Sequence, residues 1–60
     1  MADLLAEIRC VRREIELRSR VYPNWVERGK MSQANADHEI KTMKAVLARL
    51  ESMVDHMGAG

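Results

Sequence analysis

The sequence is poor in the residues that most small domains use for staples, turns and large cores. Its 60 residues include one Cys, one Pro, three Gly, one Trp, one Tyr and no Phe. A single cysteine, Cys10, cannot form a disulfide within the chain, which excludes the disulfide-bonded class of small secreted domains. The scarcity of Gly and Pro, together with many Leu, Met, Ala, Ile and Glu residues, is typical of a soluble helical protein.

No segment suggests a membrane or an export signal. The sequence has no apolar run near the roughly 20 residues that a transmembrane helix needs. Asp3 and Glu7 occupy the region where a signal peptide would carry positive charge, and no apolar segment follows them. We therefore expect a cytoplasmic protein that makes no membrane contact.

No set of residues is arranged for catalysis or for metal binding. His38 and His56 are separated by about 27 Å along one predicted helix, which is too far for them to share an ion. Cys10 has no histidine near it in the sequence, and we interpret it as an inert thiol or as a contact residue in a second interface with Leu17. We predict that the protein is not an enzyme and has no cofactor, metal or small-molecule substrate.

An apolar stripe dominates the second half of the chain. Between residues 36 and 57, apolar side chains recur at alternating steps of 4 and 3, which predicts one face of a long helix. Val46 and Met53 each precede a stripe position, so they widen the stripe beyond the narrow seam of a two-helix contact. The stripe consists of Ala36, Ile40, Met43, Leu47, Leu50, Val54 and Met57.

A shorter stripe with the same spacing predicts a first helix over residues 3–20. Arg18 falls on a stripe position, and its aliphatic stem is expected to lie along the core while its head group reaches water. The stripe consists of Leu4, Ile8, Val11, Ile15, Arg18 and Tyr22.

Residues 21–32 are predicted to form a helical corner. Pro23 disfavours helical geometry at the residue before it, so we expect the first helix to end there and a short helix to begin at Pro23. Gly29 suits the left-handed residue that closes a helix. Ser32 suits the N-cap of a second helix over residues 33–57.

We therefore predict an all-α fold in which residues 1–60 form a single helical hairpin, with a frayed tail at residues 58–60. A lone hairpin of this size with neither disulfide nor metal is marginally stable. Pairing with a second copy into an antiparallel four-helix bundle would bury the surplus apolar surface. The predicted dimer interface consists of Ile40, Met43, Val46, Leu47, Leu50, Met53, Val54 and Met57.

Positive charge is concentrated between residues 9 and 30, but the formal net charge of the whole chain is only +1. Basic residues on a helix are able to meet phosphates, which makes nucleic-acid binding an alternative function. Glu14 and Glu16 lie at helical spacing from Arg18 and Arg20, so salt bridges along the helix are the favoured interpretation.

The aromatic pair of the corner is the clearest candidate for a partner-binding site. Tyr22 and Trp25 are interpreted first as core residues, and alternatively as a partly exposed anchor, because Trp, Tyr and Arg dominate binding hot spots. The candidate partner-binding residues are Tyr22, Trp25, Arg28, Lys30, Arg13 and Arg20.

The corner and the second helix also carry a resemblance. The pattern begins at Arg13, includes Arg20 followed by Val-Tyr-Pro-x-Trp-Val from Val21 to Val26, and continues with Gly29-Lys30-Met31 and Ala36-x-x-Glu-Ile-x-x-Met43. Over about residues 13–50 it resembles a family of very small proteins encoded by phages and prophages. The resemblance carries no assigned activity. It implies a phage accessory gene, expressed in a bacterial host cell, and proteins of this kind commonly act by binding a host protein.

These observations lead to three hypotheses for the function. The first is an accessory protein that binds and inhibits or modulates a host protein, in addition to pairing with a second copy of itself. The second is a nucleic-acid-binding regulator that uses the Arg-rich first helix and corner. The third is a structural or assembly subunit of a larger complex.

Overall fold

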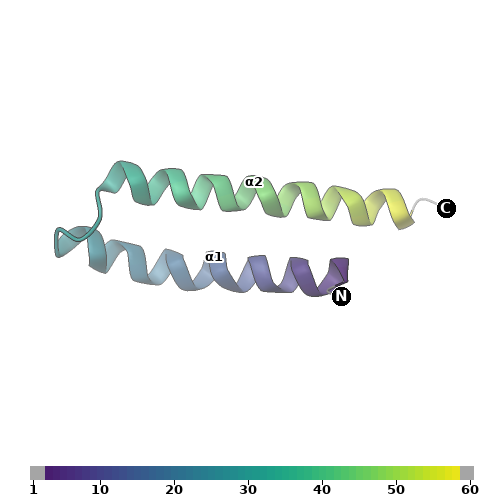
Figure 1. The fold of residues 1–60 in the computed structure, drawn as a ribbon, viewed down its shortest axis with the longest axis horizontal. Coiled ribbons are helices and arrows are strands. Elements are labelled where there is room, and N and C mark those ends of the chain that lie inside the picture. Colours follow the sequence, from purple (N-terminus) through teal and green to yellow (C-terminus); the bar gives the residue numbers. More distant parts are fainter. Residues whose placement is uncertain (1–2, 59–60) are drawn as a thin grey trace.

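The protein folds as a hairpin of two long antiparallel helices. The computed structural model describes residues 3–58, with side chains up to residue 54, so the predicted interface residue Met57 and also His56 lie outside the described side chains. Helix α1 spans Leu4–Glu27 and helix α2 spans Gln33–Gly58, and they lie side by side (Figure 1). The predicted helical hairpin is therefore confirmed.

Each helix begins directly after a residue whose side chain caps it, and for the second helix this is the predicted cap Ser32. Asp3 caps α1, because its carboxylate accepts a hydrogen bond from the backbone N–H of Ala6 at 2.7 Å. Ser32 caps α2, because its hydroxyl oxygen accepts from the backbone N–H of Asn35 at 3.1 Å. Each cap satisfies a backbone donor that has no partner inside the helix.

The prediction that Pro23 ends the first helix was wrong. Helix α1 continues through Pro23 to Glu27 without a break, so the predicted corner at residues 21–32 contracts to a link at residues 28–32. Proline removes the hydrogen bond that its own N–H would donate to the carbonyl of Ser19, and its ring crowds that carbonyl. The ring of Tyr22, one residue before Pro23, is buried in this continuous helix, and burial of an aromatic ring is large enough to offset one lost hydrogen bond.

The end of α1 is a Schellman motif built on Gly29. Gly29 has a φ of +73°, in the left-handed region, which confirms its predicted role in closing a helix. Its N–H donates to the carbonyl of Val26 at 3.0 Å, and the N–H of Lys30 donates to the carbonyl of Trp25 at 2.9 Å. These two bonds satisfy carbonyls at the helix end and turn the chain toward α2.

The two apolar stripes face each other, but only a few of their side chains are fully buried in the contact. Among the described side chains, Ile8, Tyr22 and Ala36 are the buried core, with 5%, 7% and 4% of their surface exposed. The other described stripe residues are half-buried: Leu4, Val11, Ile15, Arg18, Ile40, Met43, Leu47, Leu50 and Val54.

Replacement of Gly29 by Ala should destabilise the protein by about 1–2 kcal/mol, the cost of a left-handed conformation for an L-residue. A Cβ atom at this position would have no atom within 4 Å, so the cost comes from the backbone alone. Gly29→Asn is the control and should cost less, since Asn tolerates the left-handed region. Urea unfolding followed by circular dichroism measures both. Equal stability of Gly29→Ala and the wild type would contradict the assignment.

Replacement of Pro23 by Ala should stabilise the hairpin. The variant regains the hydrogen bond to Ser19 and is expected to gain roughly 1–2 kcal/mol, because Pro costs about 3 kcal/mol in a helix interior while its restriction of the unfolded chain returns part of that. Asn24→Ala, one residue along the same helix, is the control and should change stability by only a few tenths of a kcal/mol. A lower melting temperature for Pro23→Ala would contradict this account.

Candidate interaction surfaces

An ion pair between the helices distinguishes the two sides of the hairpin. Arg12 directly follows the stripe residue Val11, and Glu51 directly follows the stripe residue Leu50, and the two charged side chains form a salt bridge. Both are substantially exposed, so the bridge contributes little to stability. The salt bridge shows that residues which follow stripe positions lie on one side of the hairpin. It also shows that Arg12 of α1 and Glu51 of α2 lie at the same height along the helices.

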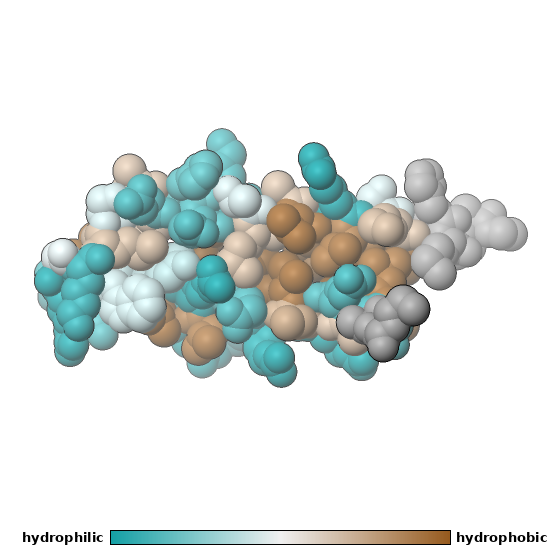
Figure 2. All heavy atoms as spheres, in the orientation of Figure 1, coloured by the Kyte–Doolittle hydropathy of each residue, from teal (hydrophilic) through white to brown (hydrophobic). Residues whose placement is uncertain are grey.

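The opposite side carries residues that precede stripe positions, and several of these are large and apolar. Val46 and Met53 are 44% and 52% exposed, and Leu17 and Trp25 are 50% and 43% exposed. In the view of Figure 2, apolar surface extends over both helices and is most extensive toward the end at which the termini lie. We refer to this side as the apolar face, defined by Leu17, Val21, Trp25, Val46 and Met53.

Tyr22 and Trp25 take different roles. The Tyr22 ring is buried and its hydroxyl accepts a hydrogen bond from Nη1 of Arg18 at 3.3 Å. This bond, with a smaller contribution from Glu14, raises the pKa of Arg18 above its ordinary value. The Trp25 ring stacks on Tyr22 at a centroid distance of 5.7 Å and is tilted by 37°. Tyr22 is therefore a core residue, in agreement with its first interpretation, and Trp25 is the exposed aromatic.

The predicted partner-binding residues do not form one surface. Arg13 and Arg20 are exposed on the outer side of α1, and Arg20 is paired with Glu16 at 2.6 Å. Arg13 lies about 18 Å along the helix from Trp25. Arg28 and Lys30 are exposed at the turn, where Arg28 is the C-cap of α1. Arg20, Arg28 and Lys30 lie within five residues of Trp25 along the chain, whereas Arg13 does not.

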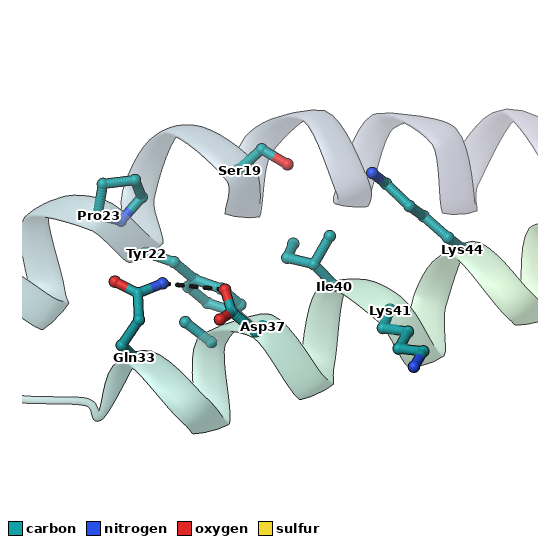
Figure 3. A pocket seen from close by; sticks show the side chains of 9 residues that line it. Ser19, Tyr22, Pro23, Gln33, Asp37, Ile40, Lys41 and Lys44 are labelled. Atoms are coloured by element: carbon teal, nitrogen blue, oxygen red, sulfur yellow. Dashed lines mark hydrogen bonds between the residues drawn. The ribbon is translucent and has the colours of Figure 1, made fainter.

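A groove opens between the helices at the turn end, on the side that carries the Arg12–Glu51 pair (Figure 3). It has a volume of about 420 Å³. The side chain of Ile40 points into the space between the helices, and the amine of Lys44 extends toward α1 (Figure 3). Nε2 of Gln33 donates to Oδ1 of Asp37 at 2.9 Å at one end. We refer to this hollow as the turn-side groove, lined by Ser19, Tyr22, Pro23, Gln33, Ala36, Asp37, Ile40, Lys41 and Lys44.

The predicted dimer interface falls into two groups. Ile40, Met43, Leu47, Leu50 and Val54 are half-buried against α1, so the hairpin itself already uses part of their surface. Val46 and Met53 are exposed on the apolar face. Sequence reasoning missed the turn-side groove and the Arg12–Glu51 pair, although charges directly after stripe positions are a signal for cross-helix pairs.

The remaining predicted positions lie on the surface. His38 is exposed and Cys10 is an exposed free thiol. The described residues contain no group of three or more His, Cys, Asp or Glu side chains placed to hold a metal ion. Neither described helix combines the length and the apolar character that crossing a membrane requires.

Comparison of the chain with protein-family models, with curated proteins and with solved structures finds no match.

Replacement of Tyr22 by Ala should destabilise the protein by about 3 kcal/mol, since it empties a buried aromatic site. The matched change Trp25→Ala should cost about 1 kcal/mol or less, because that ring is partly exposed. Urea unfolding of both variants under identical conditions measures the difference. Equal costs, or a larger cost for Trp25→Ala, would show that the two aromatics have been assigned the wrong roles.

Proposed function

We propose that this chain is a small accessory protein that acts by binding and modulating a host protein. The resemblance of residues 13–50 to phage-encoded proteins supports an origin of this kind. The observation that supports the proposal most directly is that more large apolar side chains are exposed than are buried in the hairpin. Only Ile8, Tyr22 and Ala36 are buried among the described side chains, whereas five large apolar side chains are 43–61% exposed. Apolar surface on this scale in so small a chain is typical of a protein that works in association with others.

The turn-side groove is the surface that we assign to the host protein. It is a hollow with apolar residues such as Ile40 in its floor and the cationic Lys44 beside it. Binding hot spots commonly consist of a pocket that admits one apolar anchor and is surrounded by polar residues. The groove therefore suits an apolar side chain flanked by carboxylates. Because it lies on the other side of the hairpin from the apolar face, it stays open when that face is covered.

Nucleic-acid binding is less well supported. Arg12, Arg18 and Arg20 of α1 are each paired with a glutamate, so their charges are already partly neutralised. A structural or assembly role remains compatible with the same exposed surfaces, but no particular observation favours it.

The Lys44→Glu variant should no longer bind the host protein. We expect wild-type protein immobilised as bait to capture a defined protein from nuclease-treated lysate of a bacterial host, and we expect the variant to retain less than about a tenth of it, since a reversed charge beside a binding pocket repels its ligand. Arg13→Glu is the matched control, because it makes the same charge change on the outer side of α1. Capture of the same proteins in equal amounts by all three baits would refute the assignment of the groove.

A further inference from the structure

The hairpin exposes more surface than a folded chain of its size should. Its accessible surface is 4913 Å². A compact monomer of 6.9 kDa is expected to expose roughly 4000 Å² by the usual scaling of surface with mass. The excess of roughly 900 Å² is close to the ~800 Å² per partner that a standard stable interface buries. One further layer of helices over one side of the hairpin would remove this excess.

We infer that the apolar face is covered by a second copy of this chain, in a four-helix bundle whose two turns lie at the same end. In this arrangement α1 of one copy packs against α2 of the other. The dyad axis then runs parallel to the helices. The half-buried stripe residues of both copies face the centre of the bundle, which completes a burial that the hairpin alone leaves unfinished.

Symmetry fixes the register of this dimer. Rotation about an axis parallel to the helices leaves every residue at the same height, so each residue of α1 meets the residues of the other α2 that share its level. The Arg12–Glu51 pair defines these levels within the hairpin. Counting in opposite directions from it places Leu17 level with Val46. Leu17 and Val46, the two most central of the exposed apolar side chains, therefore meet across the dimer. Symmetry leaves no freedom to shift one copy along the helix axes relative to the other.

The surface of α1 has a hollow where this contact is expected. A depression of about 440 Å³ lies on the apolar face, lined by Glu14, Leu17, Arg18, Val21, Tyr22 and Trp25. Val46 of the second copy lies at the level of Leu17, within the span of this depression. A side chain that enters a hole formed by residues of the facing helix is the usual packing unit of helical bundles.

Charge complementarity favours the same arrangement. Counting from the Arg12–Glu51 pair also places Glu14 level with Arg49, so opposite charges meet at the rim of the interface. The alternative dimer, with its turns at opposite ends and its centre at Val46, places α2 against α2. Met53, which is 52% exposed, would then face Glu39 of the other copy. That arrangement leaves an apolar side chain against a carboxylate.

The first test is the solution mass of the full chain, measured by light scattering from low micromolar to near-millimolar concentration. We expect twice 6.9 kDa, with a melting temperature that rises with concentration. Val46→Glu should raise the dissociation constant by about 100-fold, because it places a charge in the contact of each copy. Ala45→Glu, which adds the same charge to an adjacent exposed position away from the apolar face, should leave the constant unchanged. A wild-type monomer at every concentration would overturn the inference.

A second test separates the two arrangements by crosslinking. Two variant proteins are prepared in which Cys10 is replaced by Ser, so that the only cysteine is the one introduced by Leu17→Cys or by Val46→Cys. Each protein alone, and a mixture of the two, is treated with a short crosslinker that joins two thiols. We expect a crosslinked dimer only in the mixture. Crosslinking of the Leu17→Cys protein without the other variant would overturn the common-end arrangement, because such a crosslink would show that position 17 of one copy faces position 17 of the other. Since Lys44→Glu acts on the other side of the hairpin, the dimer and the capture of a host protein succeed or fail independently.

Discussion

The limited contact between two helices is the constraint on which the rest of this structure depends. Two antiparallel helices share one line of contact, and a side chain on that line is covered by one neighbouring helix only. Full burial therefore occurs where a small residue lets the backbones approach or a large ring spans the gap. Ala36 and Tyr22 are these residues at the turn end, and Ile8 is the buried residue toward the other end. The other described stripe residues stay half-buried, and the surface that this leaves is the basis of both proposed interactions.

The two sides of the hairpin differ because the residues before and after each stripe position differ. The residues that follow Val11 and Leu50 are charged and pair across the helices, whereas the residues that precede Leu47 and Val54 are apolar. One side can therefore remain in water around an open groove, while the other is costly to leave uncovered. This asymmetry would allow one small chain to use two surfaces at once, as both proposals require, one for a second copy and one for a different protein. The proposed dimer would leave two equivalent turn-side grooves on opposite outer sides of the bundle.

The turn shows how local and tertiary effects are balanced. Gly29 closes α1 through its positive φ, and the Schellman hydrogen bonds satisfy the last carbonyls without help from the rest of the protein. Pro23, in contrast, would end a helix in isolation, yet it lies inside α1. The extra turn of helix beyond it carries Trp25 and extends the stripe past Tyr22. The lost hydrogen bond is local, whereas the compensation comes from packing against α2.

The sequence by itself determined the features that depend on neighbours along the chain. The steps of 4 and 3 define both stripes, Asp3 and Ser32 supply side-chain oxygens for the helix starts, and Gly29 provides the left-handed residue. These effects act within one helical turn, so sequence periodicity and residue type are sufficient to predict them. Only the tertiary structure decided that α1 continues through Pro23, that Tyr22 is buried while Trp25 is exposed, and that Arg12 meets Glu51. Those outcomes depend on the height and rotation at which α2 lies against α1, and this placement follows from packing between residues that are far apart in the sequence.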